Sequence, residues 1–243
     1  MHRRDFLVGS AAISAASLLA ATGTAAAKAF QSAPIVNDEP LVAPKKGKIN
    51  VAVAIADRAT IIDFCGPWEV FQDVHVPERG SSMDEIMPFR LYTVARSMDP
   101  ITASAGMKIM PKYSVDNAPK PDLVVVPAMQ SNDEMLQWLA AVAPETDLTM
   151  SVCTGAFQLG KAGLLDGLVA TTHHNFYDNF EDSFPNVTLK RGVRFVENKR
   201  ISTAGGLTSG IDLALRVVER YFGRDVAQMT ADYMEYTSDG WKV

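Results

Sequence analysis

The fold is decided by one stretch, Asp147-Leu148-Thr149-Met150-Ser151-Val152-Cys153-Thr154-Gly155-Ala156. In its first six residues the apolar Leu148, Met150 and Val152 alternate with the small polar Thr149 and Ser151, which predicts a strand of a sheet. Cys153 follows that strand directly, and a helix is expected from Thr154 to Leu164. A tight strand-to-helix turn raises one side chain above the sheet, as in the nucleophile elbow of hydrolases. The stretch therefore predicts an α/β fold with Cys153 at an elbow.

Short apolar runs alternate with helical stretches along the rest of the chain from Ile49. Strands are expected at 49–55, 89–95, 101–104, 108–113, 122–127, 169–172, 187–189, 193–196 and 200–204. Helices are expected from Pro67 onward and at 132–142, 208–221 and 224–236. Runs 101–104 and 108–113 are predicted to form a hairpin. This alternation is typical of a mainly parallel sheet with helices on both faces, so one three-layer α/β domain is predicted over residues 49–243.

The first 27 residues are expected to be an export signal. Arg3-Arg4, a weakly apolar stretch and small residues at Ala25-Ala26-Ala27 are typical of a twin-arginine signal. An uncleaved membrane anchor is the alternative, but a stretch of Ala, Gly, Ser and Thr is poorly hydrophobic. Residues 28–48 are predicted to be a linker. The protein is therefore expected in the periplasm, without membrane contact after cleavage.

We expect the mature protein to start near Lys28, because the small residues that precede it form a cleavage site. Mass spectrometry of the native protein should find this start, and replacing Arg3 and Arg4 with lysine should block export. An intact Met1 in the native protein would contradict the prediction.

Composition and charge limit the classes of function. The chain has 243 residues, of which 47% are hydrophobic and 21% charged, as is ordinary for a globular protein with a sizeable core. Its net charge of −5 argues against nucleic acid as a partner. No residue spacing suggests a metal site, and no glycine-rich phosphate-binding loop is present. Neither metal nor cofactor is expected, and the expected substrate is a small molecule.

Cys153 is the leading candidate for a nucleophile. The first N–H groups of the helix point at this position, where they favour a thiolate and can hold an oxyanion. The pKa of Cys153 is therefore expected to be lowered, and its thiol should be more reactive than that of Cys65. Alternatively, Cys153 is a small buried hydrophobe, as most free cysteines are. In an oxidising compartment, a disulfide between Cys65 and Cys153 is also possible.

Two further side chains could assist the thiol. Asp63 follows the first strand, and loops at the carboxyl edge of a doubly wound sheet converge on one crevice. Against the sulfur, Asp63 should have a raised pKa, and it could donate a hydrogen bond to the thiolate or act as a general acid-base. The alternative is a helix cap. His173 follows the strand 169–172 and could act as a base, although a structural or surface histidine is commoner.

Five motifs give the chain a resemblance to a known family. They lie at residues 63–71, 151–157, 162–167, 170–173 and 202–212. In this order they resemble the ThiJ/PfpI superfamily, over about residues 49–236. The pairing of Asp63 with Cys153-Thr154 most resembles the isonitrile hydratase branch, which also includes sensor-like domains of AraC-type regulators.

The resemblance implies a flavodoxin-like, class I glutamine amidotransferase-like fold, a homodimer and no cofactor. It makes Cys153 the nucleophile, Asp63 the acidic residue at the thiol, and Thr154 the residue that assists hydration of the substrate. Gly66, in the first motif, is a further candidate. Ala128 stands where many relatives have the first of two glycines, which leaves open whether its N–H serves an oxyanion hole.

The expected function is that of a cysteine-dependent hydro-lyase or hydrolase acting on a small organic molecule. Isonitrile hydration to an N-substituted formamide is the best-matched reaction. Thr154 stands where protease-type relatives have histidine, which disfavours a peptidase, and a chain that stops at Val243 leaves no room for the helix-turn-helix of the regulators. The alternative is a non-enzymatic redox or ligand-sensing stress protein whose Cys153 is oxidised reversibly.

Overall fold

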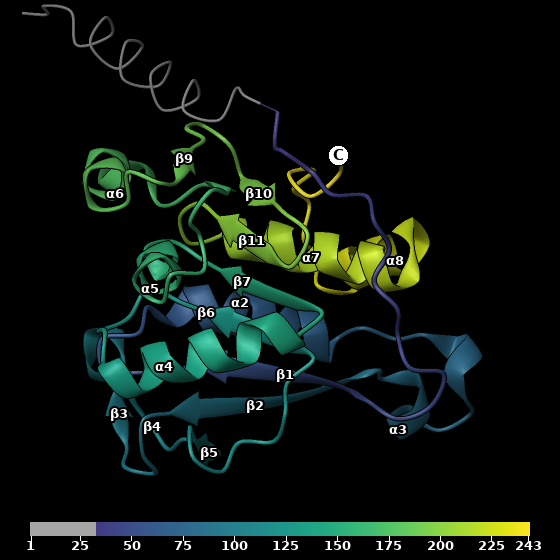
Figure 1. Ribbon diagram of the computed structural model, residues 1–243. Coiled ribbons are helices and arrows are strands. Elements are labelled where there is room, and N and C mark those ends of the chain that lie inside the picture. The colour runs from purple at the N-terminus through teal and green to yellow at the C-terminus, as the bar shows by residue number, and fades with distance from the viewer. Residues whose placement is uncertain (1–32) are drawn as a thin grey trace, which may run out of the picture.

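A seven-stranded sheet forms the centre of the computed structural model, which describes residues 33–243 (Figure 1). The strand order is β10-β11-β7-β6-β1-β2-β5, and every pair is parallel except β10 with β11. The strands are β1 (Ile49–Ala54), β2 (Phe89–Ala95), β5 (Tyr113–Ser114), β6 (Leu123–Val126), β7 (Leu148–Ser151), β10 (Phe195–Glu197) and β11 (Ile201–Ala204). The predicted mainly parallel sheet is confirmed.

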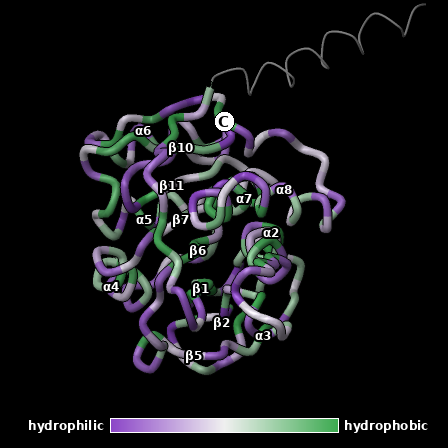
Figure 2. Tube along the Cα trace, turned by 90° about the vertical axis from the view of Figure 1, so that its right-hand side faces the viewer, coloured by the Kyte–Doolittle hydropathy of each residue, from purple (hydrophilic) through white to green (hydrophobic). Residues whose placement is uncertain are grey.

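Helices cover both faces of this sheet, which confirms the three layers (Figure 2). One face carries α2 (Ile61–Gln72), α7 (Ser209–Phe222) and α8 (Arg224–Tyr233), and the other carries α4 (Asp133–Val142), α5 (Gly155–Lys161) and α6 (Tyr177–Ser183). Successive residues of β1 enter different cores: Val51 and Val53 face the first group of helices, and Ala52 and Ala54 the second. A strand buried on both faces has no side that faces solvent, which is why β1 shows no polar alternation and has Asn50 as its one polar residue.

Short elements complete the chain. The helix α3 (Met83–Ile86) precedes β2, β3 (Ile101–Thr102) pairs with β4 (Lys108–Ile109), and β8 (Val169–Ala170) pairs with β9 (Thr188–Leu189). The predicted hairpin is confirmed in β3 and β4, but the run 108–113 divides between β4 and the edge strand β5 of the main sheet. The helix that follows Cys153 also ends earlier than predicted, at Lys161.

The start of α2 differs most from the prediction. Proline favours the first turn of a helix, which is why the helix was expected to begin at Pro67. It begins at Ile61 instead, with Pro67 inside it. An interior proline removes the hydrogen bond that its own N–H would donate to the carbonyl four residues earlier, and its ring crowds that carbonyl, so the packing of the buried α2 must outweigh this cost. Asp63 consequently lies in the first helical turn rather than in a loop.

The residues 33–48 lie against the domain and do not form a free linker. Ile35 makes an isolated parallel bridge with Val196, and its carbonyl accepts a hydrogen bond of 2.8 Å from the Glu197 N–H. Farther along, the Leu41 N–H donates to the Arg220 carbonyl at 2.9 Å. The part of the predicted linker within the described residues is thus held along β10 and α7. The predicted export signal lies outside the described residues.

A buried charge cluster holds this segment. The carboxylate of Glu197 accepts hydrogen bonds from Arg216 at 3.0 Å and from Arg220 at 3.1 Å, and all three side chains are buried. Arg216 also binds the Asp38 carboxylate, and Arg220 donates to the Glu39 carbonyl at 3.1 Å. Glu197 therefore pairs with two guanidinium groups that also anchor the N-terminal segment, and Asp38 and Glu219 add negative charge at Arg216.

Within residues 33–243, no helix combines the length and apolar character that a membrane crossing needs.

Candidate functional site

Cys153 lies at the turn between β7 and α5, as predicted. Its φ of 58° is in the left-handed region, which non-glycine residues rarely adopt outside functional or tightly held turns. Two hydrogen bonds hold this backbone: the Cys153 N–H donates to the Gly205 carbonyl at 2.7 Å, and its carbonyl accepts from the Thr172 hydroxyl at 2.9 Å. The side chain is 7% exposed, so the sulfur lies at the bottom of the site.

Gly155 allows the elbow to close against the neighbouring strand. A Cβ atom at this position would lie 2.1 Å from the carbonyl oxygen of Val126 at the end of β6. The helix α5 can start this close to the sheet only because the side chain is missing. The glycine two residues after Cys153 is therefore required by packing.

Asp63 brings a carboxyl group from α2 to the thiol. Its side chain is fully buried, and its Oδ2 accepts a hydrogen bond of 3.1 Å from the Ala128 N–H. Oδ1 is also buried, without a well-aligned hydrogen-bond partner among the described residues, and the Cys153 thiol interacts with the carboxyl group. The N-cap of α2 is Thr60, and the bond to Ala128 joins Asp63 to a different loop. The helix-cap alternative is therefore wrong.

Burial raises the pKa of Asp63 to about 7. The hydrogen bonds from the Ala128 N–H and the Cys153 thiol oppose this shift, because both favour the charged carboxylate. The predicted direction for Asp63 is confirmed. A carboxyl group that titrates near neutral pH can both accept and donate a proton there.

The pKa of Cys153 is shifted in the direction opposite to the prediction. Burial and the negative charge of Asp63 raise it to about 11, whereas the backbone N–H groups of Thr154 and Leu207 lower it by a smaller amount. The helix α5 has only seven residues, and its N-terminal field is outweighed. The neutral-pH state is therefore a thiol beside a titrating carboxyl group.

Both cysteines are free, so the possible disulfide is not formed. Cys65 lies within α2 itself, half-buried, where burial and the charge of Glu69 raise its pKa.

Leu207 is a site residue that the sequence analysis missed. Its backbone N–H, with that of Thr154, points at the Cys153 sulfur, and its φ of 51° holds the loop in a left-handed turn. The Ala128 N–H is bound to Asp63 instead. The backbone N–H groups of Thr154 and Leu207 are thus the donors that point at an anion on the Cys153 sulfur. Only the glycine pair Gly205-Gly206 ahead of Leu207 signals such a turn in the sequence.

The remaining candidate residues differ in their contacts with Cys153. Thr154 follows Cys153 directly, is half-buried and makes no side-chain capping bond to α5. His173 packs on Gly206, where a Cβ atom would lie 2.3 Å from its ring, and its Nδ1 accepts from the Asn175 N–H at 3.2 Å. Among the described residues, no hydrogen bond joins His173 to Cys153.

The pKa of His173 is lowered by burial and by the neighbouring His174. The ring next to the site is therefore neutral near pH 7. Gly66 lies at the contact of α2 with α7, where a Cβ atom would meet Ile211 at 2.9 Å. The structure thus brings together Asp63, Cys153 and Thr154, places His173 beside the Gly206 loop, and leaves Gly66 in a helix-packing position.

In the part of the chain that the structure describes, no group of three or more His, Cys, Asp or Glu side chains is arranged to hold a metal ion.

Comparison with known proteins gives consistent matches. The DJ-1/PfpI family model matches residues 49–220. Isonitrile hydratase of Pseudomonas putida is 29% identical over 72% of this chain and 73% of that protein. The HTH-type transcriptional regulator GbdR of Pseudomonas aeruginosa is 28% identical over 61% of this chain, but the match spans only 41% of the regulator.

Solved structures agree with this result. A THiJ/PfpI family protein from Pseudomonas syringae superposes with a TM-score of 0.69 at 26% identity, covering 81% of this chain and 78% of the other. Drosophila melanogaster DJ-1beta superposes with a TM-score of 0.65 at 15% identity, covering 79% of this chain and all of the other, and shows that the fold is shared.

Proposed function

Because the chain belongs to the DJ-1/PfpI family, we propose that it is a cysteine-dependent enzyme that hydrates a small isonitrile to an N-substituted formamide. The observation that carries the proposal is the buried Asp63 carboxyl group beside the Cys153 thiol at the elbow. The similarity to isonitrile hydratase of Pseudomonas putida supports the choice of reaction.

Asp63 and Cys153 together can carry out the first half of isonitrile hydration, which is the addition of the thiol to the isonitrile. The Asp63 carboxylate takes the thiol proton while the Cys153 sulfur attacks the terminal carbon of the isonitrile. That proton then passes to the same carbon, which leaves a thioimidate bound through sulfur. A base with a pKa of about 7 is half ionised at neutral pH, and it can return the proton that it has taken.

Water completes the reaction. It adds to the thioimidate carbon, one of its protons reaches the nitrogen through Asp63, and Thr154 helps to position the water. The carbon–sulfur bond then breaks, the hydroxyl proton of the intermediate returns to sulfur, and the formamide leaves. Negative charge that develops at the carbon or sulfur is stabilised by the N–H groups of Thr154 and Leu207.

Replacing Cys153 with alanine should abolish turnover of a small alkyl isonitrile, because no covalent adduct can form. Formation of the N-alkyl formamide, followed by mass spectrometry, measures the effect. Cys65→Ala is the matched control and should retain activity, since Cys65 lies outside the pair. Full activity in Cys153→Ala, or no activity in the unmodified protein with any small isonitrile, would contradict the proposal.

A second candidate function is ligand or redox sensing without turnover. It is favoured by the match to the regulator GbdR, which covers 61% of this chain. Here Cys153 would be oxidised reversibly or would contact the ligand. Lack of isonitrile turnover, together with oxidation of Cys153 by a peroxide to a sulfenic acid that a thiol reductant reverses, would favour the sensor.

We also propose that the protein acts in the periplasm as a homodimer. The twin arginines and small residues of the first 27 residues support export, and the family resemblance supports the dimer. Size-exclusion chromatography with light scattering would contradict the dimer if it gave the mass of a single chain.

A further inference from the structure

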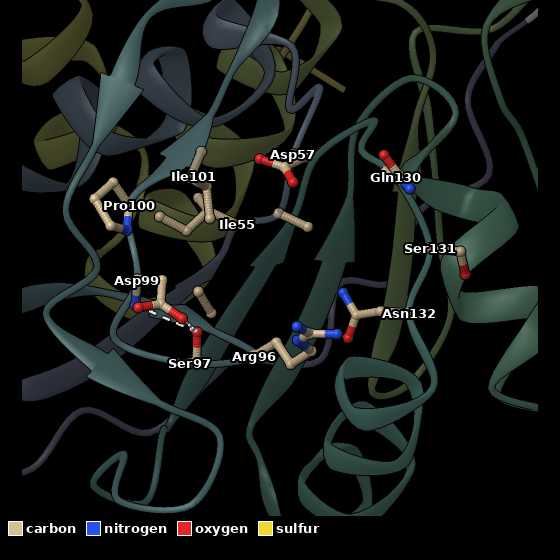
Figure 3. Close-up of a pocket in the computed structure, with 12 residues that line it drawn as sticks. Ile55, Asp57, Arg96, Ser97, Asp99, Pro100, Ile101, Gln130, Ser131 and Asn132 are labelled. Carbon is tan, nitrogen blue, oxygen red and sulfur yellow. Dashed lines mark hydrogen bonds between the residues drawn. The ribbon is translucent and has the colours of Figure 1, made fainter.

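A cavity separate from the cysteine site opens at the carboxyl edge of the central sheet (Figure 3). Its volume of about 200 Å³ suits a small ligand. The lining comes from the segments that follow β1, β2 and β6, and it includes neither Cys153 nor Asp63.

The position of this cavity is one that the topology favours for ligands. After β1 the chain adds β2 and β5 on one side of it and then returns to place β6 on the other. The connections therefore reverse direction between β1 and β6. In open α/β sheets, ligands bind outside the carboxyl ends of the strands at this switch point. Residues 55–57 and 130–132, which follow β1 and β6, line adjacent parts of the cavity, and the Gln130 N–H donates to the Asp57 carbonyl at 2.8 Å.

The charges of the cavity are divided between its sides. Asp57 lies on one side, and Arg96 lies beside Asn132 on the opposite side (Figure 3). The Thr102 N–H donates to Asp57 at 2.7 Å and fixes that carboxylate at the rim. Asp99 accepts a hydrogen bond from the Ser97 hydroxyl at 2.9 Å on a third side. Between these groups lie the apolar side chains of Ile55, Pro100 and Ile101.

From this arrangement we propose that the cavity binds a small zwitterion of the α-amino-acid class. Its carboxylate would contact Arg96 and the amide of Asn132, its ammonium group would contact Asp57, and a short apolar side chain would lie on Ile55 and Ile101. A simple anion would face two carboxylates, and a simple cation would face the guanidinium. Only a ligand with both charges is matched on both sides.

Arg96 keeps a partner when the cavity is empty. Its guanidinium lies 3.9 Å from Glu134, and both side chains are more than half exposed. Solvent weakens such a pair, so a bound carboxylate can displace it. The open rim also weakens the ligand contacts, and we expect binding in the millimolar range.

The test is an NMR titration of the full-length Cys153→Ala protein, in which chemistry at the thiol cannot contribute. L-Alanine should shift the backbone amides of Asp57, Arg96 and Asn132, whereas propionate and ethylamine should bind at least fivefold more weakly. Arg96→Gln and Asp57→Asn should each weaken L-alanine binding at least fivefold. Arg90→Gln is the matched control, because Arg90 is an exposed arginine of β2, the strand that Arg96 follows, and does not line the cavity; it should leave binding unchanged.

Three outcomes would overturn the proposal. These are no amide shifts with L-alanine, unchanged L-alanine binding in both cavity variants, and propionate or ethylamine binding as strongly as L-alanine. Because the titration uses a protein without the nucleophile, its result is independent of whether the proposed isonitrile hydration is correct.

Discussion

Replacing Asp63 with asparagine should lower isonitrile turnover by about 10²–10⁴-fold and at the same time accelerate alkylation of Cys153. Asparagine has nearly the same shape and can still accept the hydrogen bond from the Ala128 N–H, so the fold should be kept. It cannot carry a proton between thiol, substrate and water, which removes turnover. It also removes the negative charge that raises the pKa of Cys153, so more thiolate is present at a given pH.

Formamide production and the rate of iodoacetamide labelling at pH 8 measure the two effects on one sample. Asp73→Asn, at the other end of the same helix, is the matched control and should change neither. The sequence analysis treated Asp63 as a possible donor that stabilises the thiolate. Asparagine keeps a donor, so that role predicts little change in the labelling of Asp63→Asn and slower labelling of Asp63→Ala. That pair of results would contradict the role of the Asp63 charge, and unchanged turnover in Asp63→Asn would remove Asp63 from the mechanism.

The pH dependence of the activity should also reveal the ionisation of the Asp63 carboxyl group. Activity of the unmodified protein should rise through about pH 7 as Asp63 ionises, and this rise should be absent in the residual activity of Asp63→Asn.

The folded-state pKa of Asp63 is raised, so its contribution to stability is full below about pH 4 and is lost as the pH rises through about 7. The stability of Asp63→Asn relative to the unmodified protein should consequently rise between about pH 4 and pH 7 and stay constant above that.

Replacing Glu197 with glutamine should reduce the free energy of unfolding by about 3–5 kcal/mol. The guanidinium groups of Arg216 and Arg220 stay buried in this variant, but they lose the carboxylate that both contact. Denaturant unfolding measures the loss. The segment 33–41 should also become more sensitive to proteolysis, because both arginines hold it.

Glu145→Gln provides the control for this variant. Glu145 pairs with Lys120 at 3.1 Å, but both side chains are 67% exposed, so the loss should be less than about 1 kcal/mol. An equal effect in the two variants would show that burial of the Glu197 cluster adds nothing to stability.

The order of elements could be predicted from the sequence because each depends on a local pattern. Apolar runs such as 49–55 have no polar side to expose, so they indicate strands inside a sheet. The transition from such a run to small residues at Cys153 marked the elbow, and the φ of 58° agrees with it. The predicted helix start at Pro67 was wrong, because α2 begins at Ile61 and contains Pro67. Proline is favoured at the start of a helix, and the local sequence pattern does not show that this helix holds a proline in its interior.

By itself, the sequence of this protein determined the α/β class, the family resemblance and the pairing of a candidate nucleophile with a candidate acid. Only the tertiary structure decided how that pair ionises, that the Ala128 N–H binds Asp63, and that Leu207 supplies an N–H to the sulfur. The physical reason is that backbone periodicity is local, whereas a pKa depends on burial and on charges from distant segments. Asp63 and Cys153 come from different helices and strands, and their mutual shift exists only when the sheet has brought those elements together.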